Sequence, residues 1–270
     1  MTPRAVARVI VLALVLPLLS GCGALAEKDK NDGIALYNAG KFADAIPRLE
    51  KALEWEPGDH ETRGYYAMAL TRGGKPNEAI EQWLRVLKFS PEWAEAHYWL
   101  GIAYLSTDRM KKAMEHWVRT AEIDSTHIGA HYNLGLAYVK MGLLPLAVEE
   151  WSTVLLIDPT HYEARVNRAR VRALQGEIAG TLEDFLVAVA IRPDAAVNWL
   201  SLGEAYFLLG DSAHAVASID SFFSRHGEQD ETARKARVLR ERIVAGEKPP
   251  PIGASPLGIT PQSLAAPPGG

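Results

Sequence analysis

The sequence predicts an all-α solenoid of six helix-turn-helix units followed by a capping helix, and two observations predict it. Three similar blocks, "AIEQWLRVLKFSP", "AMEHWVRTAEIDS" and "AVEEWSTVLLIDP", follow one another at an interval of 34 residues. The same interval places a proline at positions 57, 91, 159 and 193, with no insertion or deletion. A helix pair of this length cannot bury its apolar face alone, so neighbouring units are expected to stack.

The interval divides residues 26–229 into six units. Position eight of each unit is always small and position 24 is always large, as in Gly101 and Trp117. A small residue opposite a large one lets two helices approach closely, so we expect these two columns to form the core. A turn residue separates the two helices, and proline ends the second helix. The units are 26–59, 60–93, 94–127, 128–161, 162–195 and 196–229, with turns at Gly40, Gly74, Asp108, Gly142, Gly176 and Gly210.

With these columns, the chain resembles the tetratricopeptide repeat family over all six units. The resemblance implies a right-handed superhelix of helix pairs, in which the first helix of each unit forms most of the concave face. It also implies that this face is a partner-binding groove, lined at the corresponding positions of this sequence. These residues are Met68, Tyr98, Ile102, Leu105, Tyr132, Leu136, Val139, Val166, Arg170, Leu200, Glu204 and Phe207.

The expected groove is apolar and aromatic at its centre. Such a surface suits an amphipathic helix or an extended apolar peptide. It lacks the basic residues with which some relatives hold a chaperone's terminal carboxylate. An alternative stays open: the units pack tightly enough to cover this surface, or the C-terminal tail folds back into it.

The N-terminal residues predict a secretory signal. Arg4 and Arg8 precede the apolar run Val9–Leu19, which is too short to span a bilayer, since that takes about 20 residues. The following Leu-Ser-Gly-Cys resembles the lipobox of bacterial lipoproteins, which implies cleavage before Cys22 and a diacylglycerol on its sulfur. We therefore expect a signal peptide over 1–21 and a lipidated tether over 22–32. An ordinary signal peptide with an incidental cysteine, or an uncleaved anchor, is the alternative.

Gly23 follows the predicted lipid attachment site. An aspartate at this position commonly retains lipoproteins at the inner membrane in well-studied systems. The resemblance therefore favours the outer membrane, facing the periplasm, over the inner membrane.

Two segments with different compositions follow the last unit. Residues 228–246 carry an apolar stripe on a charged helix, which suits a terminal cap with a soluble outer face. Residues 247–270 are rich in proline, which forbids regular helix or strand, and predict a disordered tail. A ligand segment for another protein's aromatic groove is the alternative for this tail.

Unit five departs from the repeat, because it carries Arg165, Arg168 and Arg172, and the last two stand at positions that are usually apolar or aromatic in the other units. An unpaired arginine at such a position is costly. Arg168 and Asp184 lie on facing helices of the same unit, so we predict a salt bridge between them. A basic patch for an acidic partner is the alternative.

No motif for catalysis stands out. His127 and His131 are four residues apart, as in zinc peptidases, but no glutamate follows the first histidine and no third ligand is evident. The only cysteine excludes a disulfide within the chain. We therefore predict no enzyme, no metal and no cofactor.

The charge excludes a general nucleic-acid-binding role. The formal net charge is -4, and it falls to -6 once the two arginines of the signal segment are removed.

The sequence therefore predicts a membrane-anchored adaptor that binds one or more envelope proteins. The architecture is similar to that of pilotin-type lipoproteins, which help to assemble a type IV pilus secretin. This pathway rests on analogy alone. The alternatives are a docking factor for cell-wall hydrolases or proteases, a self-assembling structural protein, and a metal-dependent enzyme. The sequence does not decide the oligomeric state.

Overall fold

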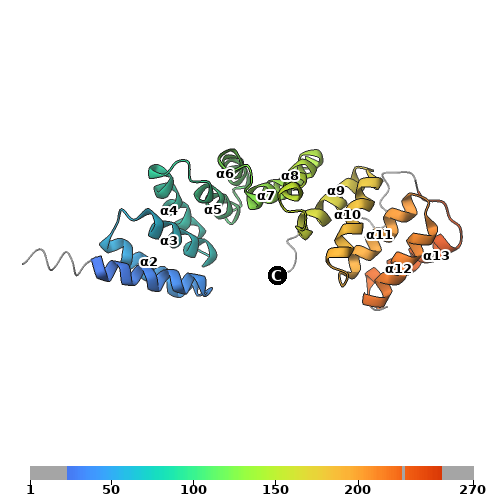
Figure 1. The fold of residues 1–270 in the computed structure, drawn as a ribbon, viewed down its shortest axis with the longest axis horizontal. Coiled ribbons are helices and arrows are strands. Elements are labelled where there is room, and N and C mark those ends of the chain that lie inside the picture. Colours follow the sequence, from blue (N-terminus) through green and yellow to red (C-terminus); the bar gives the residue numbers. More distant parts are fainter. Residues whose placement is uncertain (1–22, 227–228, 251–270) are drawn as a thin grey trace, which may run out of the picture. The chain divides into compact units, whose positions relative to one another are not determined.

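The computed structural model describes residues 23–226 and 229–250, and within these ranges the chain is built of helices and turns without strands (Figure 1). A first helix covers residues 23–38. The others are α2 (Phe42–Trp55), α3 (His60–Arg72), α4 (Pro76–Phe89), α5 (Ala94–Leu105), α6 (Met110–Ile123), α7 (Ile128–Lys140), α8 (Leu144–Ile157), α9 (Tyr162–Leu174), α10 (Ile178–Ile191), α11 (Ala196–Leu208), α12 (Ser212–His226) and α13 (Glu231–Val244).

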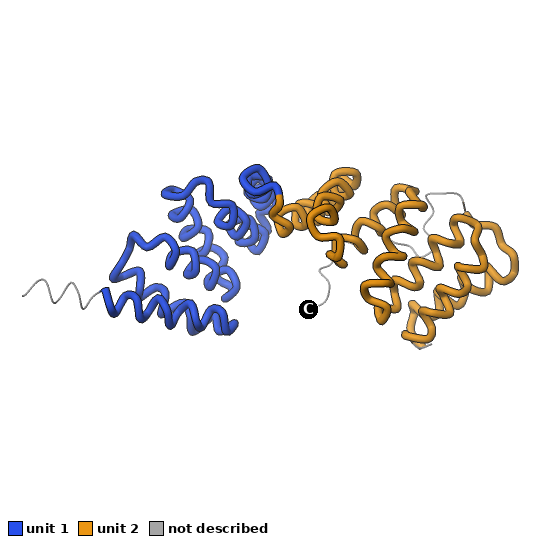
Figure 2. Tube along the Cα trace, in the orientation of Figure 1, with its two compact units in different colours: residues 1–125 blue, residues 126–270 orange. Residues whose placement is uncertain are grey.

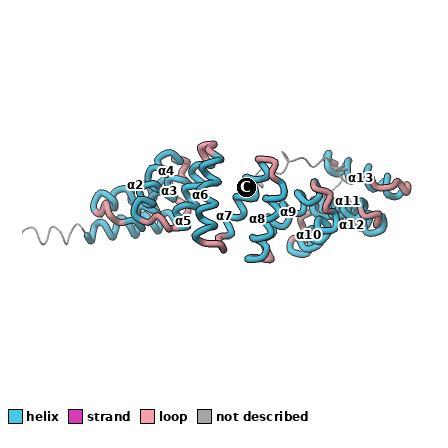
Figure 3. Tube along the Cα trace, turned by 90° about the horizontal axis from the view of Figure 1, so that it is seen from above, coloured by secondary structure: helices cyan, strands magenta, loops and turns pink. Residues whose placement is uncertain are grey.

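The chain forms two compact units, which Figure 2 shows in different colours. The N-terminal unit, residues 1–125, contains helices up to α6, and the C-terminal unit, residues 126–270, contains α7 to α13. From α2 to α6 and from α7 to α13, each helix packs on the next one along the chain, and short turns join them (Figure 3). The all-α helical-repeat fold predicted from the sequence is confirmed.

In the third and fourth repeats, the two helices meet where a glycine faces a tryptophan. A Cβ atom on Gly101 would lie 2.4 Å from Nε1 of Trp117, and Gly135 and Trp151 repeat this arrangement at the same distance. Each of these two indoles also donates to a backbone carbonyl of the facing helix, at 3.3 Å. Trp83, Trp117 and Trp151 are almost fully buried, which confirms that the large column belongs to the core.

The turn inside each 34-residue repeat has a residue in the left-handed conformation at the predicted position. Five of the six are glycines, with φ between 74° and 80°. The sixth is Asp108, with a φ of 59°. Glycine adopts this conformation without steric cost, and aspartate is among the few other residues that tolerate it.

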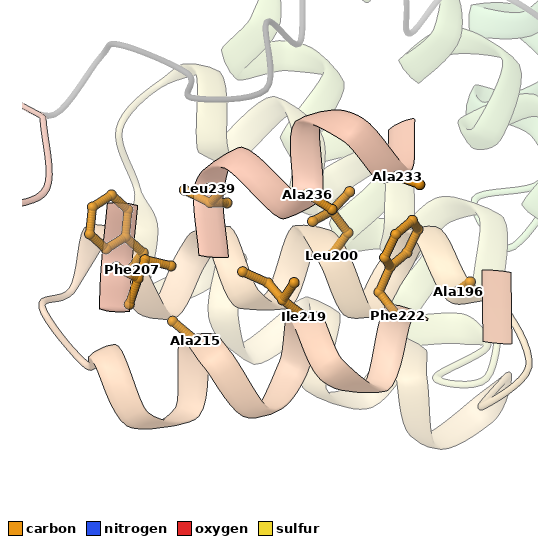
Figure 4. Packing of buried hydrophobic residues seen from close by; sticks show 10 residues of the cluster. Ala196, Leu200, Phe207, Ala215, Ile219, Phe222, Ala233, Ala236 and Leu239 are labelled. Carbon is orange, nitrogen blue, oxygen red and sulfur yellow. The ribbon is translucent and has the colours of Figure 1, made fainter. Parts of the chain in front are cut away.

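Helix α13 caps the C-terminal unit. Leu239 and Ala236 lie against Leu200, Ile219 and Phe222 of the two preceding helices (Figure 4). The aspartate N-cap, Asp230, accepts from the backbone of Ala233 at 2.7 Å and starts the helix. The predicted cap over 228–246 is present, with helical bounds of Glu231–Val244.

The described part of the predicted lipidated tether, residues 23–32, lies within the first helix, which covers residues 23–38. Ala26 is buried against the body. Asp29 is also buried, and its carboxylate pairs with Arg48 at 3.0 Å and Lys51 at 3.3 Å of α2. These contacts hold the first helix against α2, the second helix of the first repeat. Cys22, the signal segment 1–21 and tail residues 251–270 lie outside the described residues.

Candidate functional site

The predicted groove residues of the C-terminal unit divide into covered and accessible side chains. Tyr132, Leu136 and Arg170 are partly exposed on the first helices of their repeats, α7 and α9. The hydroxyl of Tyr132 accepts from Asn167 Nδ2 at 3.2 Å, which ties its ring to the next repeat. Burial raises the pKa of this hydroxyl above its ordinary value, so it stays neutral at physiological pH.

Five predicted groove residues are wrong, because the structure buries them. Val139, Val166, Leu200 and Phe207 are between 0% and 6% exposed. Val139 and Val166 belong to core clusters that extend onto the following repeat. Leu200 and Phe207 pack in the cluster formed with α12 and α13. Column position alone does not tell how far a neighbouring repeat or the cap covers a side chain. Glu204, from the same face, is buried as well.

The N-terminal unit keeps its predicted groove residues accessible. Met68, Tyr98 and Ile102 are partly exposed, and Leu105 is 38% exposed. They lie on α3 and α5, the first helices of two successive repeats. The sulfur of Met68 accepts from the hydroxyl of Tyr37 at 3.6 Å.

An aromatic patch that the sequence analysis missed surrounds Met68. Tyr37 and Tyr65 meet edge to face with their centroids 5.8 Å apart. The guanidinium of the exposed Arg72 lies 5.1 Å from the ring of Trp99 and 5.9 Å from that of Tyr37. Tyrosine, tryptophan and arginine are the residues that most often dominate binding energy at interfaces. Tyr65 and Trp99 share position six of their units, so an aromatic residue recurring in that column was the available signal.

The predicted salt bridge between Arg168 and Asp184 is confirmed, and it is part of a larger cluster. Arg168 donates to both carboxylate oxygens of Asp184, at 2.9 and 2.6 Å. Arg165 at 3.3 Å and Arg172 at 3.0 Å complete a set of three arginines around one fully buried carboxylate. Arg168 also donates to the hydroxyl of Ser152 on α8 at 2.9 Å. The cluster therefore links three successive helices and fills the space that apolar residues fill in other units.

The two spaced histidines of α7 do not converge on a common point. Nδ1 of His127 accepts from the backbone of Ala130 at 3.1 Å and caps the helix. His131 pairs with Glu150 at 2.7 Å. Over the described part of the chain, no group of three His, Cys, Asp or Glu side chains could hold a metal ion. None of the helices described is both long and apolar enough to cross a membrane.

Comparison with known families gives two matches, one in each compact unit. A model described as "TPR repeat" matches residues 67–108. A model described as "Tetratricopeptide repeat" matches residues 132–196. No curated protein matches the chain.

Solved structures with the same fold cover most of the chain at low sequence identity. YrrB, described as a TPR protein with an unusual peptide-binding site, is 19% identical, with a TM-score of 0.62 over 72% of this chain and 97% of YrrB. PilF from Pseudomonas aeruginosa is 15% identical, with a TM-score of 0.64 over 84% of this chain and all of PilF. The C-terminal part of a TPR protein from Cytophaga hutchinsonii is 12% identical, with a TM-score of 0.67 over 80% of this chain and 86% of that one.

These identities establish a shared fold and no more. The 34-residue columns, the glycine–tryptophan contacts, the left-handed turns and the family matches in both units agree. The chain therefore carries tetratricopeptide repeats in both compact units and has the fold of tetratricopeptide repeat proteins.

Proposed function

We propose that this protein is a membrane-anchored adaptor that holds a partner protein at the bacterial cell envelope. The repeat fold is a scaffold for protein–protein interaction, and its first helices expose apolar and aromatic side chains. The observation that carries the proposal is the patch of the N-terminal unit, where Met68, Tyr98 and Ile102 stand beside Tyr65 and Trp99, all partly exposed. Solvated aromatic and aliphatic groups gathered in this way suit the apolar side of a partner helix or peptide.

The anchoring part of the proposal rests on the sequence around Cys22. The tetrapeptide Leu19-Ser20-Gly21-Cys22 fits the lipobox, and lasting attachment requires two or more acyl chains on one residue. Gly23 favours the outer membrane over the inner membrane. The likeness to PilF is consistent with a role in assembling a pilus or secretin, although a shared fold alone does not carry a pathway.

Photocrosslinking in the native host tests the adaptor role. A photoreactive residue replaces Tyr98 in the N-terminal unit or Tyr132 in the C-terminal unit, and captured species are identified by mass spectrometry. The matched control position is Leu156 on α8, a second helix of a repeat, where the side chain is 83% exposed. One discrete protein captured from Tyr98 or Tyr132, and not from Leu156, supports the adaptor. Equal capture from all three positions contradicts it.

The anchor is tested separately by metabolic labelling with a palmitate analogue. We expect label on the wild-type protein and none on the Cys22→Ser variant, which should leave the membrane fraction. Separating the inner and outer membranes by density then locates the labelled protein. Labelling that survives Cys22→Ser would contradict the anchor without affecting the adaptor proposal.

A further inference from the structure

Helix α9 carries four arginines, and only three of them have a counter-charge. Arg165, Arg168 and Arg172 all reach the buried carboxylate of Asp184. Arg170 lies two residues from both Arg168 and Arg172. At about 100° per residue, its side chain leaves the helix roughly 200° away from theirs. Arg170 therefore points away from the cluster, on the face predicted to form the groove.

Arg170 has no counter-ion on that face. Among the described residues, no carboxylate pairs with it and no oxygen accepts a hydrogen bond from it. Glu163, the only acidic residue of α9, pairs with Arg192 at 3.0 Å. The neutral hydroxyl of Tyr162 accepts a hydrogen bond from Asn198 Nδ2 at 2.5 Å.

The surroundings of Arg170 are poor in water. Its side chain is partly buried. Burial also lowers the pKa of the guanidinium below its ordinary value. Removing a charge from water without giving it a partner is costly, so the free protein holds this group in an unfavourable state. A bound carboxylate would relieve that state.

We propose that the C-terminal unit binds an acidic peptide segment of a partner protein, and that Arg170 receives one Asp or Glu carboxylate of that segment. This proposal rests on the proposed adaptor function and names the chemistry of the partner. Leu136 and Tyr132, partly exposed on α7, give the apolar residues of the segment a surface to lie on. Residues 249–270 contain no Asp or Glu, so the tail has no side-chain carboxylate to offer Arg170.

The test is selection of a phage-displayed library of random peptides on the immobilised full chain. We expect the wild-type protein to enrich peptides that carry one Asp or Glu among apolar residues. The Arg170→Gln variant should lose this enrichment. The control, Arg234→Gln, should keep it, because Arg234 lies on the cap helix with its side chain 70% exposed and paired with Glu231.

A double-mutant cycle then measures the contact with the selected peptide. Arg170→Gln in the protein, or replacement of the acidic residue of the peptide by its amide, should each weaken binding about tenfold or more. Combining both changes should add little to either one, because they remove the same interaction. Independent, additive losses would overturn the assignment of Arg170.

Two further outcomes separate this proposal from the adaptor function. If wild-type and Arg170→Gln proteins select the same peptides, groove binding stands and the role of Arg170 is wrong. If neither protein selects any peptide, the peptide site of the C-terminal unit is wrong, and photocrosslinking from Tyr98 still decides the adaptor function of the N-terminal patch. The free protein provides an independent readout, because Arg170→Met removes an unpaired charge and should raise the melting temperature. A lower melting temperature would show that Arg170 is paired within the protein and would overturn the proposal.

Discussion

Nδ1 of His97 lies 3.0 Å from Nδ1 of His116, and the two residues occupy positions four and 23 of unit three. The same two positions are joined in other units by Asp29 and Arg48, Arg63 and Gln82, His131 and Glu150, and Arg165 and Asp184, always nineteen residues apart. The first five repeats therefore carry a polar link between their two helices, and the residue types that form it differ from one repeat to the next.

Unit three is distinct because its link consists of two bases. Nε2 of His97 lies 3.0 Å from the carbonyl of Pro91, which can only accept, so this nitrogen carries a proton. When both rings are neutral, Nδ1 of His97 accepts and Nδ1 of His116 donates. Burial, and then the charges of His97 and Lys112, lower the pKa of His116 from 6.5 to about 4. The fold therefore favours the neutral form of His116.

The first prediction concerns the pH dependence of stability. Between pH 6.5 and about 4, the unfolded chain binds more protons at His116 than the folded chain does. The contribution of this residue to the free energy of unfolding is therefore constant above pH 6.5 and is lost as the pH falls towards 4. Urea denaturation at a series of pH values should show a shallower loss for His116→Asn than for the wild type.

A second prediction follows from the contact between Gly101 and Trp117. A Cβ atom at position 101 would lie 2.4 Å from the indole, and the indole is only 1% exposed and has no room to move. Gly101→Ala should therefore lower the free energy of unfolding by roughly 1 to 3 kcal/mol, the usual cost of overpacking a core. Gly58→Ala is the control, because a Cβ there meets nothing within 4 Å. Equal stability of the two variants in chemical denaturation would show that the interface yields more easily than this geometry implies.

The third prediction concerns the arginine cluster of unit five. Asp184→Asn removes the only buried carboxylate that Arg165, Arg168 and Arg172 share. Breaking a buried ion pair from one side leaves uncompensated charge and typically costs roughly 3 to 5 kcal/mol. The free energy of unfolding should fall by about that amount in denaturant titrations.

The matched control for Asp184 lies on the surface of the same compact unit. Asp220 pairs with Arg240, and their side chains are 51% and 40% exposed. Asp220→Asn should cost less than about 1 kcal/mol, because water screens such pairs. A loss at Asp184 no larger than the loss at Asp220 would mean that water reaches the cluster.

The sequence was sufficient to predict the features that recur with the 34-residue period. The turn positions, the buried tryptophans and the pairing of Arg168 with Asp184 all follow from columns within one unit, where the two helices face each other in a fixed register. Whether a predicted groove residue is exposed depends on more than one repeat. Val139 and Leu200 occupy columns that face a groove in the family, yet the following repeat and the cap cover them here. Coverage depends on how closely successive helices approach, and no single column records that distance.

The structure also contains more polar contacts between helices than the columns predicted. Arg165 and Arg172 join Arg168 at Asp184 because long arginine side chains reach one acceptor from three turns of a helix. The first repeat gives a second example. No column predicted a partner for Asp29, whose carboxylate pairs with Arg48 and Lys51 of α2.

The last prediction concerns the cap, where two adjacent residues of α13 face opposite ways. Leu239 is 3% exposed and packs with Ile219 and Phe222, whereas Val238 is 51% exposed. Leu239→Ala should lower the free energy of unfolding by roughly 2 to 5 kcal/mol, because it leaves a cavity under the cap. Val238→Ala should change it by less than about 0.5 kcal/mol, since it removes surface that water already reaches. Helix α13 ends the described repeat stack. If it unfolded independently of the repeats, the two variants would be equally stable. The difference in stability between them therefore measures whether α13 unfolds together with the repeats that it covers.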